Sequence, residues 1–194
     1  LLLKNQLPSL RSLHNTKIYP YARFHICRYT MEEIYTTLAE AAIKLLKNRK
    51  NGKEKLGDHV QVFIGIAGGP GSGKTTTAAK VCNIINTRNV KCIVLPMDGY
   101  HYYKKELDKM KNPEEAHRYR GAPYTFNSKR FIEDMLYAKN TGSGSFPDFD
   151  HSAGDPNEDQ IKLDPSVEIL LVEGNYVLLA EDPWCKLSKN IFDI

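Results

Sequence analysis

Residues 68–75 of this 194-residue chain have the sequence GGPGSGKT, which matches the phosphate-binding P-loop pattern G-x-x-x-x-G-K-[ST] at every required position. Glycines let a backbone turn tightly and direct successive N–H groups at phosphate oxygens. Lys74 can reach the β- and γ-phosphates, and the Thr75 hydroxyl can bind Mg²⁺. The sequence therefore predicts a nucleoside triphosphate site, with ATP and Mg²⁺ as cofactors. The residues expected to contact the nucleotide are Gly68, Gly69, Pro70, Gly71, Ser72, Gly73, Lys74, Thr75 and Thr76.

The segments on either side of this loop fit the same interpretation. Residues 60–67 have the apolar pattern of a buried strand, and residues 75–86 have the spacing of an amphipathic helix. Such a helix points its positive N-terminus at the phosphates. The alternative is a glycine–serine linker that matches the pattern by chance, and the strand before and the helix after the loop count against it. The residues expected on the buried face of the helix are Ala78, Ala79, Val81, Cys82 and Ile85.

Asp98 directly follows a second predicted strand, residues 90–96. Phosphoryl transfer needs a group that accepts the proton of the attacking hydroxyl, and a carboxylate near the γ-phosphate can do this. The alternative is an Asp-Gly turn, which is common anywhere. A position one strand away from the P-loop favours catalysis. Asp98 and Lys74 are therefore the predicted catalytic residues.

Glu173 ends a third predicted strand, residues 167–172. A carboxylate at this edge can hold Mg²⁺ directly or through water. The alternative is an ordinary acid at the end of a strand. Four apolar residues precede it, and it falls at the same predicted sheet edge as the P-loop. Thr75 and Glu173 are therefore the predicted metal ligands.

Two long polar segments, residues 97–126 and 141–165, separate the second and third predicted strands. The second of them shows no periodicity, so we expect it to be irregular. Loops of this length are usually functional or disordered, and these leave the strand ends where ligands bind in such sheets. We therefore expect them to bind substrate, the alternatives being a solvated basic loop and turn-capping side chains. The candidate substrate residues are Tyr100, His101, Arg118, Arg120, Asp150 and His151.

The remaining periodic segments complete an α/β pattern. A helix is predicted from Met31, with Thr30 and Glu33 as a capping box, and another from residue 127 or 128 to about residue 139. Residues 191–194 resemble a fourth strand. Strands that alternate with helices predict a doubly wound parallel sheet. The expected buried residues are Ile34, Leu38, Ala41, Ala42, Leu45 and Leu46 in the first helix, and Phe131, Ile132, Met135 and Leu136 in the other.

Composition indicates a soluble protein with one ordinary core, because 41% of the residues are hydrophobic and no apolar run approaches the roughly 20 residues that a membrane helix needs. Residues 1–31 hold five of the 27 basic residues and no acid, so the rest of the chain has 22 basic and 23 acidic residues. We therefore expect neither nucleic acid nor membrane as a partner. The four cysteines are scattered, which indicates reduced thiols. Oligomeric state is left open.

The sequence divides into three predicted parts. Residues 1–30 form a basic leader that we expect to be disordered, residues 31–59 a helix and linker, and residues 60–194 the P-loop domain. The leader resembles a mitochondrial targeting segment, but it also fits upstream sequence ahead of a start at Met31. We favour the second interpretation and hence the cytoplasm, with the mitochondrion as the alternative.

Five runs of residues, taken in chain order, resemble the phosphoribulokinase/uridine kinase family of P-loop kinases. They are residues 68–75, 98–100, 120–123, 149–151 and 173–176, within a resemblance that covers residues 62–194. The Arg-Gly-Ala-Pro and Glu-Gly-Asn-Tyr forms look most like less characterised bacterial and fungal members, closer to pantothenate kinase than to true uridine kinases. The resemblance implies a nucleoside-kinase-like P-loop fold and ATP-dependent phosphorylation of a hydroxyl on a small molecule. It also implies Asp98 as base and Glu173 near the metal.

The sequence departs from this family at its end. In the family an arginine-bearing lid and a further strand near the adenine follow the fourth strand, whereas this sequence stops at Ile194. The resemblance therefore implies a kinase domain that is incomplete, truncated at the C-terminus. Either the chain is a fragment, or it binds nucleotide without efficient transfer.

Three other functions compete with a small-molecule kinase. A regulatory GTPase would carry Asn-Lys-x-Asp and Asp-x-x-Gly motifs, which do not occur in these residues. A motor or assembly ATPase would not need the two long polar segments. A nucleotide-binding protein without kinase activity is the third. The kinase is the favoured interpretation, with a nucleoside, a pantothenate-like acid or a sugar derivative as the acceptor.

Overall fold

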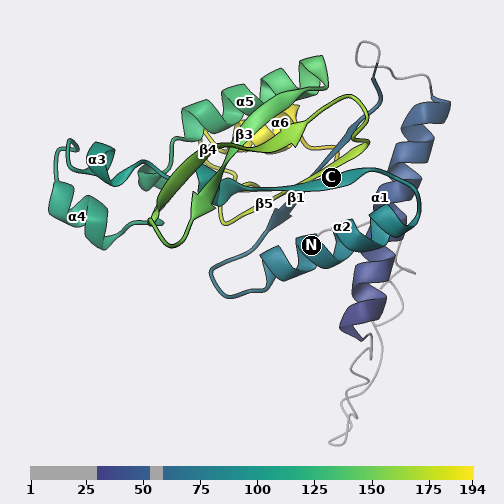
Figure 1. Ribbon diagram of the computed structural model, residues 1–194, viewed down its shortest axis with the longest axis horizontal. Coiled ribbons are helices and arrows are strands. Elements are labelled where there is room, and N and C mark those ends of the chain that lie inside the picture. The colour runs from purple at the N-terminus through teal and green to yellow at the C-terminus, as the bar shows by residue number, and fades with distance from the viewer. Residues whose placement is uncertain (1–29, 53–58) are drawn as a thin grey trace, which may run out of the picture. The chain divides into compact units, whose positions relative to one another are not determined.

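The computed structural model describes residues 30–52 and 59–194 (Figure 1). The predicted leader and most of the linker at residues 48–58 thus lie outside the described residues. In chain order the elements are α1 (Met31–Asn51), β1 (Val62–Ala67), α2 (Lys74–Thr87), β2 (Cys92–Pro96), the 3₁₀ helix η2 (Met97–Tyr100), α3 (Lys104–Leu107), α4 (Pro113–Arg118), the 3₁₀ helix η3 (Pro123–Thr125), α5 (Ser128–Thr141), β3 (Gly144–Asp150), β4 (Asp155–Leu163), β5 (Ile169–Gly174) and α6 (Cys185–Asn190).

Three parallel strands form the central sheet in the order β1-β5-β2. All six residues of β5 are buried, because this strand lies between the other two and has helices on both faces. Side chains of alternate strand residues enter two separate cores. Phe63 and Leu170 pack with α5 and α6, whereas Val62 and Ile169 pack with α1 and α2. The predicted doubly wound α/β fold is therefore confirmed.

Each long helix buries one stripe of side chains, and the sequence places these stripes within about one residue. In α1 the buried residues are Tyr35, Ala39, Ala42 and Leu46, so the stripe is centred one position away from the predicted one, and Ile34 and Leu38 are half-buried. Two predicted core residues are wrong: Ala79 of α2 and Leu136 of α5 are exposed. Among the described residues, no helix is long and apolar enough to cross a membrane. Cys82, Cys92 and Cys185 are free.

The predicted irregular segment at residues 141–165 is wrong, because most of it forms an antiparallel hairpin of β3 and β4. The turn residues and charged residues of this segment give it no strand pattern in the sequence. In the structure Phe146 and Leu163 are buried and pack the hairpin against the core. The register shifts between Phe146 and Asp148, where Pro147 has no N–H to give to the ladder. The hairpin brings residues 144–155 against η2, next to the end of β2.

The predicted fourth strand does not form as a β-strand, although the described residues 193 and 194 lie beside β1. Asp193 N–H donates to Phe63 O at 2.8 Å, and Gly65 N–H donates to Ile194 O at 3.0 Å. The Asp193 carboxylate also accepts two hydrogen bonds from Arg49, at 2.9 and 2.6 Å, and one from the Phe63 N–H at 2.8 Å. This carboxylate therefore ties α1 to β1.

Candidate functional site

The P-loop connects the end of β1 to the start of α2, as predicted. Gly71 and Gly73 have φ angles of 75° and 80°, in the left-handed region that glycine adopts without strain. Ser72 N–H donates to Gly69 O at 3.1 Å, and Thr77 N–H donates to Gly73 O at 2.8 Å. The sequence therefore folds into a tight loop that leads directly into a helix N-terminus.

The space beside Gly69 is open. A Cβ built on Gly69 meets no described atom within 4 Å, and its φ is not positive. Neither crowding nor backbone strain within the described protein therefore explains a glycine here. Gly68 differs, because its Cβ would lie 2.4 Å from Ser72 Oγ. A glycine at position 69 leaves room for a phosphate to approach the backbone closely.

Glu173 lies at the centre of the site, paired with Ile66 of β1 and Pro96 of β2 at the carboxyl edge of the sheet. Its side chain is only 3% exposed. Thr75 Oγ1 donates to Glu173 Oε1 at 2.8 Å, and Lys74 Nζ lies 3.9 Å from Oε2. Oε2 is buried and has no hydrogen-bond partner in the part of the chain that the structure describes. A buried acceptor without a donor costs about 1–3 kcal/mol, so this oxygen is a candidate ligand for a bound cation.

Burial raises the pKa of Glu173, while the Thr75 hydrogen bond and the charge of Lys74 lower it and the charge of Asp98 raises it again. A cation at Oε2 would offset this cost of burying a carboxylate. The oxygens of Thr75 and Glu173 are ligands that Mg²⁺ prefers, and Mg²⁺ needs few protein ligands because it keeps water and phosphate oxygens. The residues present thus fit Mg²⁺.

Asp98 lies in η2, directly after β2, and its charge acts on Glu173. The neighbouring Gly99 fixes this turn against the hairpin, because a Cβ there would lie 2.3 Å from Pro147 O. Close backbone packing therefore requires glycine at this position. The structure brings four predicted residues to one edge of the sheet. Lys74 and Thr75 begin the helix that follows β1, Asp98 lies in the turn after β2, and Glu173 lies near the end of β5.

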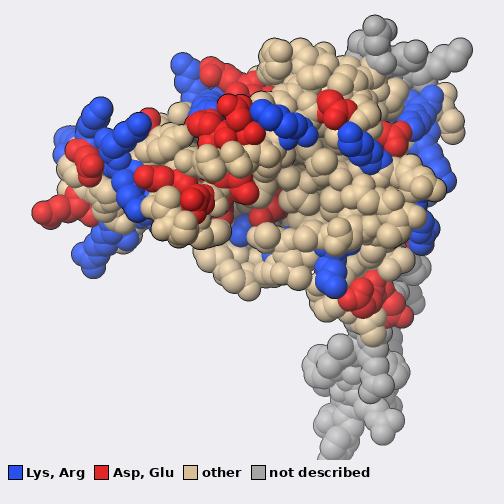
Figure 2. Space-filling model, viewed as in Figure 1, with Lys and Arg blue, Asp and Glu red and all other residues tan. Residues whose placement is uncertain are grey.

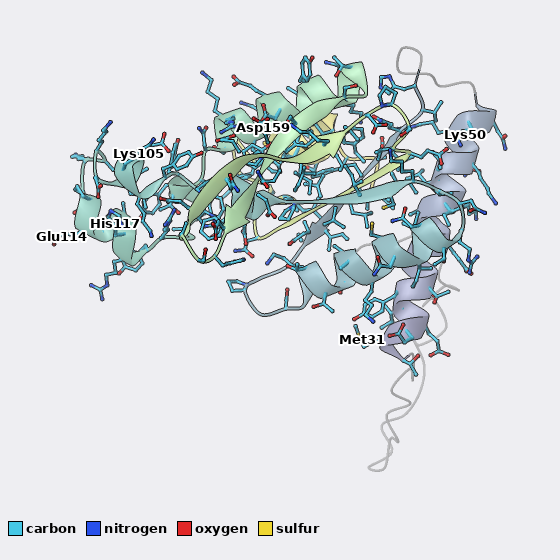
Figure 3. All side chains as sticks on the ribbon, in the orientation of Figure 1. Met31, Lys50, Lys105, Glu114, His117 and Asp159 are labelled. Atoms are coloured by element: carbon cyan, nitrogen blue, oxygen red, sulfur yellow. The ribbon has the colours of Figure 1, made fainter. Side chains whose placement is uncertain are left out.

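Two of the six candidate substrate residues lie elsewhere. Tyr100 is buried in the core, and its hydroxyl donates to Asp134 Oδ2 at 2.9 Å. Arg118 is exposed at the end of α4, with its guanidinium 5.5 Å from the Tyr119 ring centroid. Helices α3 and α4 form an arm at the left of the view, where charged side chains of both signs gather (Figure 2). Lys105, Glu114 and His117 mark this arm (Figure 3).

Arg120 and Asp150 make contacts within the protein. The Arg120 guanidinium donates to Gly154 O, to Tyr102 O at 2.9 Å and to Asp155 Oδ1 at 2.8 Å. Asp150 Oδ1 accepts hydrogen bonds from Ser152 and Ala153. Arg120 therefore fastens the hairpin turn to the loop after η2, and Asp150 caps that turn.

His101 and His151 both contact Phe149 of β3. The His101 ring centroid lies 4.9 Å from that of Phe149 and 3.9 Å from that of Phe126, and the exposed His151 ring lies 5.2 Å from Phe149. Burial lowers the pKa of His101, against the carbonyl and charge of Asp98, which raise it. The His101 ring also bonds to the Asp98 turn, because its Nδ1 lies within hydrogen-bond distance of Asp98 O.

Tyr176 and Thr125 support this side of the site, and the sequence analysis missed both. The Tyr176 hydroxyl donates to Gly121 O at 2.7 Å, and Thr125 Oγ1 accepts from Gly121 N–H at 2.9 Å. Gly121 itself has a φ of 106°, which favours glycine. Tyr176 belongs to the Glu-Gly-Asn-Tyr run and Gly121 to the Arg-Gly-Ala-Pro run. The sequence shows that both runs are present, but it does not show that they contact each other.

Comparison with known proteins finds relatives that match most of this chain. A Schizosaccharomyces pombe protein named "Putative uridine kinase" is 41% identical over 164 residues, which cover 82% of this chain and 65% of that protein. A Kluyveromyces lactis protein named "ATP-dependent kinase YFH7" is 29% identical, over 71% of this chain and 48% of its own length. The chain therefore spans about half to two thirds of these curated relatives.

Two solved structures share the fold. The Saccharomyces cerevisiae YFH7 structure superimposes with a TM-score of 0.70 at 21% identity, covering 80% of this chain and 78% of that one. A "putative fructose transport system kinase" from Silicibacter sp. gives a TM-score of 0.70 at 23% identity, covering 86% of this chain and 72% of that one. Residues 63–189 match the phosphoribulokinase/uridine kinase family. The chain, with its P-loop, its Asp98 turn and its buried Glu173, belongs to the phosphoribulokinase/uridine kinase family.

Proposed function

We propose that this protein transfers the γ-phosphoryl group of ATP to a hydroxyl of a small metabolite. The observation that carries the proposal is that Lys74 and Thr75 lie against the buried Glu173 carboxylate, while Asp98 lies two residues beyond Pro96, the β2 residue paired with Glu173. A nucleotide-binding protein without transfer would need the first two residues and Glu173, but not a carboxylate in the Asp98 turn. Relatives named as kinases support the same class of reaction.

Each residue has a defined role in this proposal. Lys74 and the P-loop N–H groups would hold the β- and γ-phosphates, and Thr75 and Glu173 would hold Mg²⁺, which neutralises charge on the phosphates when bound. Asp98 would accept the proton of the acceptor hydroxyl while the oxygen of that hydroxyl forms a bond to the γ-phosphorus. The bond from that phosphorus to the bridging oxygen of ADP breaks. The products are ADP and a phosphomonoester.

The acceptor belongs, in this proposal, to one of three classes: a nucleoside, a pantothenate-like acid or a sugar derivative. The Arg-Gly-Ala-Pro and Glu-Gly-Asn-Tyr runs favour a branch near pantothenate kinase. The S. pombe relative is named a putative uridine kinase, and this name favours a nucleoside acceptor. Arg120 is already paired with Asp155, so an anionic acceptor would have to compete for this cation.

The test is a screen for ATP consumption with a panel of nucleosides, hydroxy acids and sugars, using the full-length protein and Mg²⁺. We expect one class to raise ADP formation well above the rate with water, and a phosphorylated product to accumulate. The Asp98→Asn variant serves as the control, because it keeps the shape of the side chain but cannot act as a base. ADP formation that no member of the panel raises, with ATP bound normally, would favour a nucleotide-binding protein or ATPase.

A further inference from the structure

His101 is bound to Asp98 in two ways. Its backbone N–H donates to Asp98 O at 3.2 Å, and its ring Nδ1 lies 2.8 Å from the same oxygen. A carbonyl oxygen can only accept a hydrogen bond, so Nδ1 must carry the proton. In a neutral imidazole the other nitrogen, Nε2, is then an acceptor. This bond defines the tautomer of His101.

The surroundings of His101 hold its ring in place. A β-bridge pairs the His101 and Phe126 backbones, and the ring contacts those of Phe126 and Phe149. Burial favours the neutral imidazole, and the charged groups that act on it are Asp98, Arg120 and His151. The ring is thus fixed by packing as well as by its hydrogen bond.

The Asp98 turn is therefore held by two contacts. Gly99 packs against Pro147 O of β3, where no side chain would fit, and the His101 ring bonds to the carbonyl of Asp98. The turn has only four residues, Met97–Tyr100, so a change at either contact alters the backbone that carries the Asp98 carboxylate. A misplacement of about 1 Å in a reacting group can cost about 100-fold in rate.

We infer that His101 is a positioning residue, which directs the Asp98 carboxylate at the acceptor hydroxyl through the Nδ1–H bond to the Asp98 carbonyl. The inference rests on the proposed role of Asp98 as base. It assigns His101 an indirect role, whereas a substrate-binding residue would use Nε2 to contact the acceptor. The two nitrogens lie at different places on the ring, so the two roles can be separated.

Two amide substitutions make this separation. In His101→Asn the side-chain amide nitrogen is as far along the chain as Nδ1, and it can donate to Asp98 O. In His101→Gln the amide nitrogen takes the place of Nε2 instead. We expect kcat to stay within about threefold of the wild type in H101N and to fall about 10- to 100-fold in H101Q, with the KM for ATP unchanged in both. Turnover is measured with the best acceptor of the panel, or with water if none is found.

A spectroscopic measurement tests the contact without any activity. Long-range ¹H–¹⁵N NMR of the full chain with labelled histidine distinguishes an Nδ1–H from an Nε2–H imidazole, and we expect Nδ1–H for His101. The control His117→Gln, on the exposed arm, should leave this signal and turnover unchanged.

Three results would overturn the inference: an Nε2–H tautomer at His101, turnover retained in H101Q but lost in H101N, or equal turnover in the two variants. The second result would make His101 a substrate-binding residue. If instead the tautomer is Nδ1–H but Asp98→Asn retains full turnover, the proposed base is wrong while the contact is real.

Discussion

The two sides of the site are built in different ways. The nucleotide side, formed by the P-loop, Lys74, Thr75 and Glu173, depends on one loop and one strand end. It contains a buried carboxylate oxygen that has no hydrogen-bond partner among residues 30–52 and 59–194. The proposed acceptor side, formed by residues 97–126 and the β3–β4 hairpin, is instead cross-linked by hydrogen bonds between distant residues. Arg120 bonds to Asp155, 35 positions away, and Tyr176 to Gly121, 55 positions away, although the buried Arg120 Nε has no partner among the described residues. These cross-links make this side a packed wall, whereas residues 69–73 of the P-loop are exposed.

This difference shows where each side can be damaged. A substitution on the nucleotide side should change the affinity for Mg-ATP and leave the folded chain intact, because the loop makes few contacts that the core needs. A substitution in the wall of the acceptor side should change stability before it changes nucleotide affinity. Asp98 is the exception, since it belongs to the acceptor side but is proposed to react.

The largest expected effect is that of Asp98→Asn. The variant cannot accept a proton, so turnover should fall by about 10²- to 10⁴-fold while the affinity for ATP stays nearly constant. Steady-state kinetics and calorimetry measure the two quantities. Asp108→Asn, on the exposed arm, is the matched control. Turnover within a few-fold of the wild type would reduce Asp98 to a turn residue.

The next effect is that of Lys74→Ala on the nucleotide side. Hydrogen bonds to charged groups contribute about 1.5–3 kcal/mol each, so the affinity for Mg-ATP should fall by about 10- to 100-fold. Lys80→Ala, on the exposed surface of the same helix, should bind ATP as the wild type does. Calorimetry that gives the same affinity for both variants would contradict the assignment of the P-loop as the nucleotide site.

Arg120→Ala tests the wall of the acceptor side. Its guanidinium is largely buried and donates three hydrogen bonds, so we expect the free energy of unfolding to fall by about 1.5–3 kcal/mol. The affinity for Mg-ATP should remain within about twofold. Arg118→Ala, whose side chain is exposed, should change stability by less than about 0.5 kcal/mol. Urea denaturation measures the free energy of unfolding of both variants. Equal values would contradict the claim that Arg120 holds this side of the site together.

The smallest effect is the pH dependence caused by Glu173. Because its pKa in the folded chain is raised above the ordinary 4.5, the folded state binds more protons than the unfolded state just above that pH. Without ligand, the free energy of unfolding should therefore fall as the pH rises from about 4.5 through the raised pKa. Glu173→Gln should remove this fall and stabilise the ligand-free chain at neutral pH by about 1 kcal/mol. Denaturation curves at several pH values measure this dependence. A Glu173→Gln variant whose free energy of unfolding still falls over the same pH range would contradict the prediction.

The place and shape of the P-loop could be predicted, because its pattern is local, whereas its contacts to a nucleotide stay a prediction. Gly71, Gly73 and Lys74 are dictated by a short loop and by the helix that follows it. The parallel sheet was predictable for the same reason, since each strand is a continuous apolar run. The hairpin was not, because its strands are polar and depend on Phe146 and Leu163 packing on distant helices.

The acceptor side was predicted only as a region. The candidate residues were chosen for their chemistry, yet Tyr100 is bound to Asp134 and Arg120 to Asp155. Such pairs are set by tertiary contacts that no spacing in the sequence reveals. The sequence also could not show that the two runs of residues carrying Gly121 and Tyr176 touch each other.

The most direct test of the account is to follow the labelled γ-phosphoryl group of ATP in the full-length protein, comparing the wild type with Asp98→Asn. We predict that the wild type forms a labelled phosphomonoester with one class of acceptor, and only with Mg²⁺ present. The variant should bind Mg-ATP equally well and form almost none. Label that appears only in inorganic phosphate, at the same rate in both proteins, would contradict the proposal that the two sides together transfer a phosphoryl group.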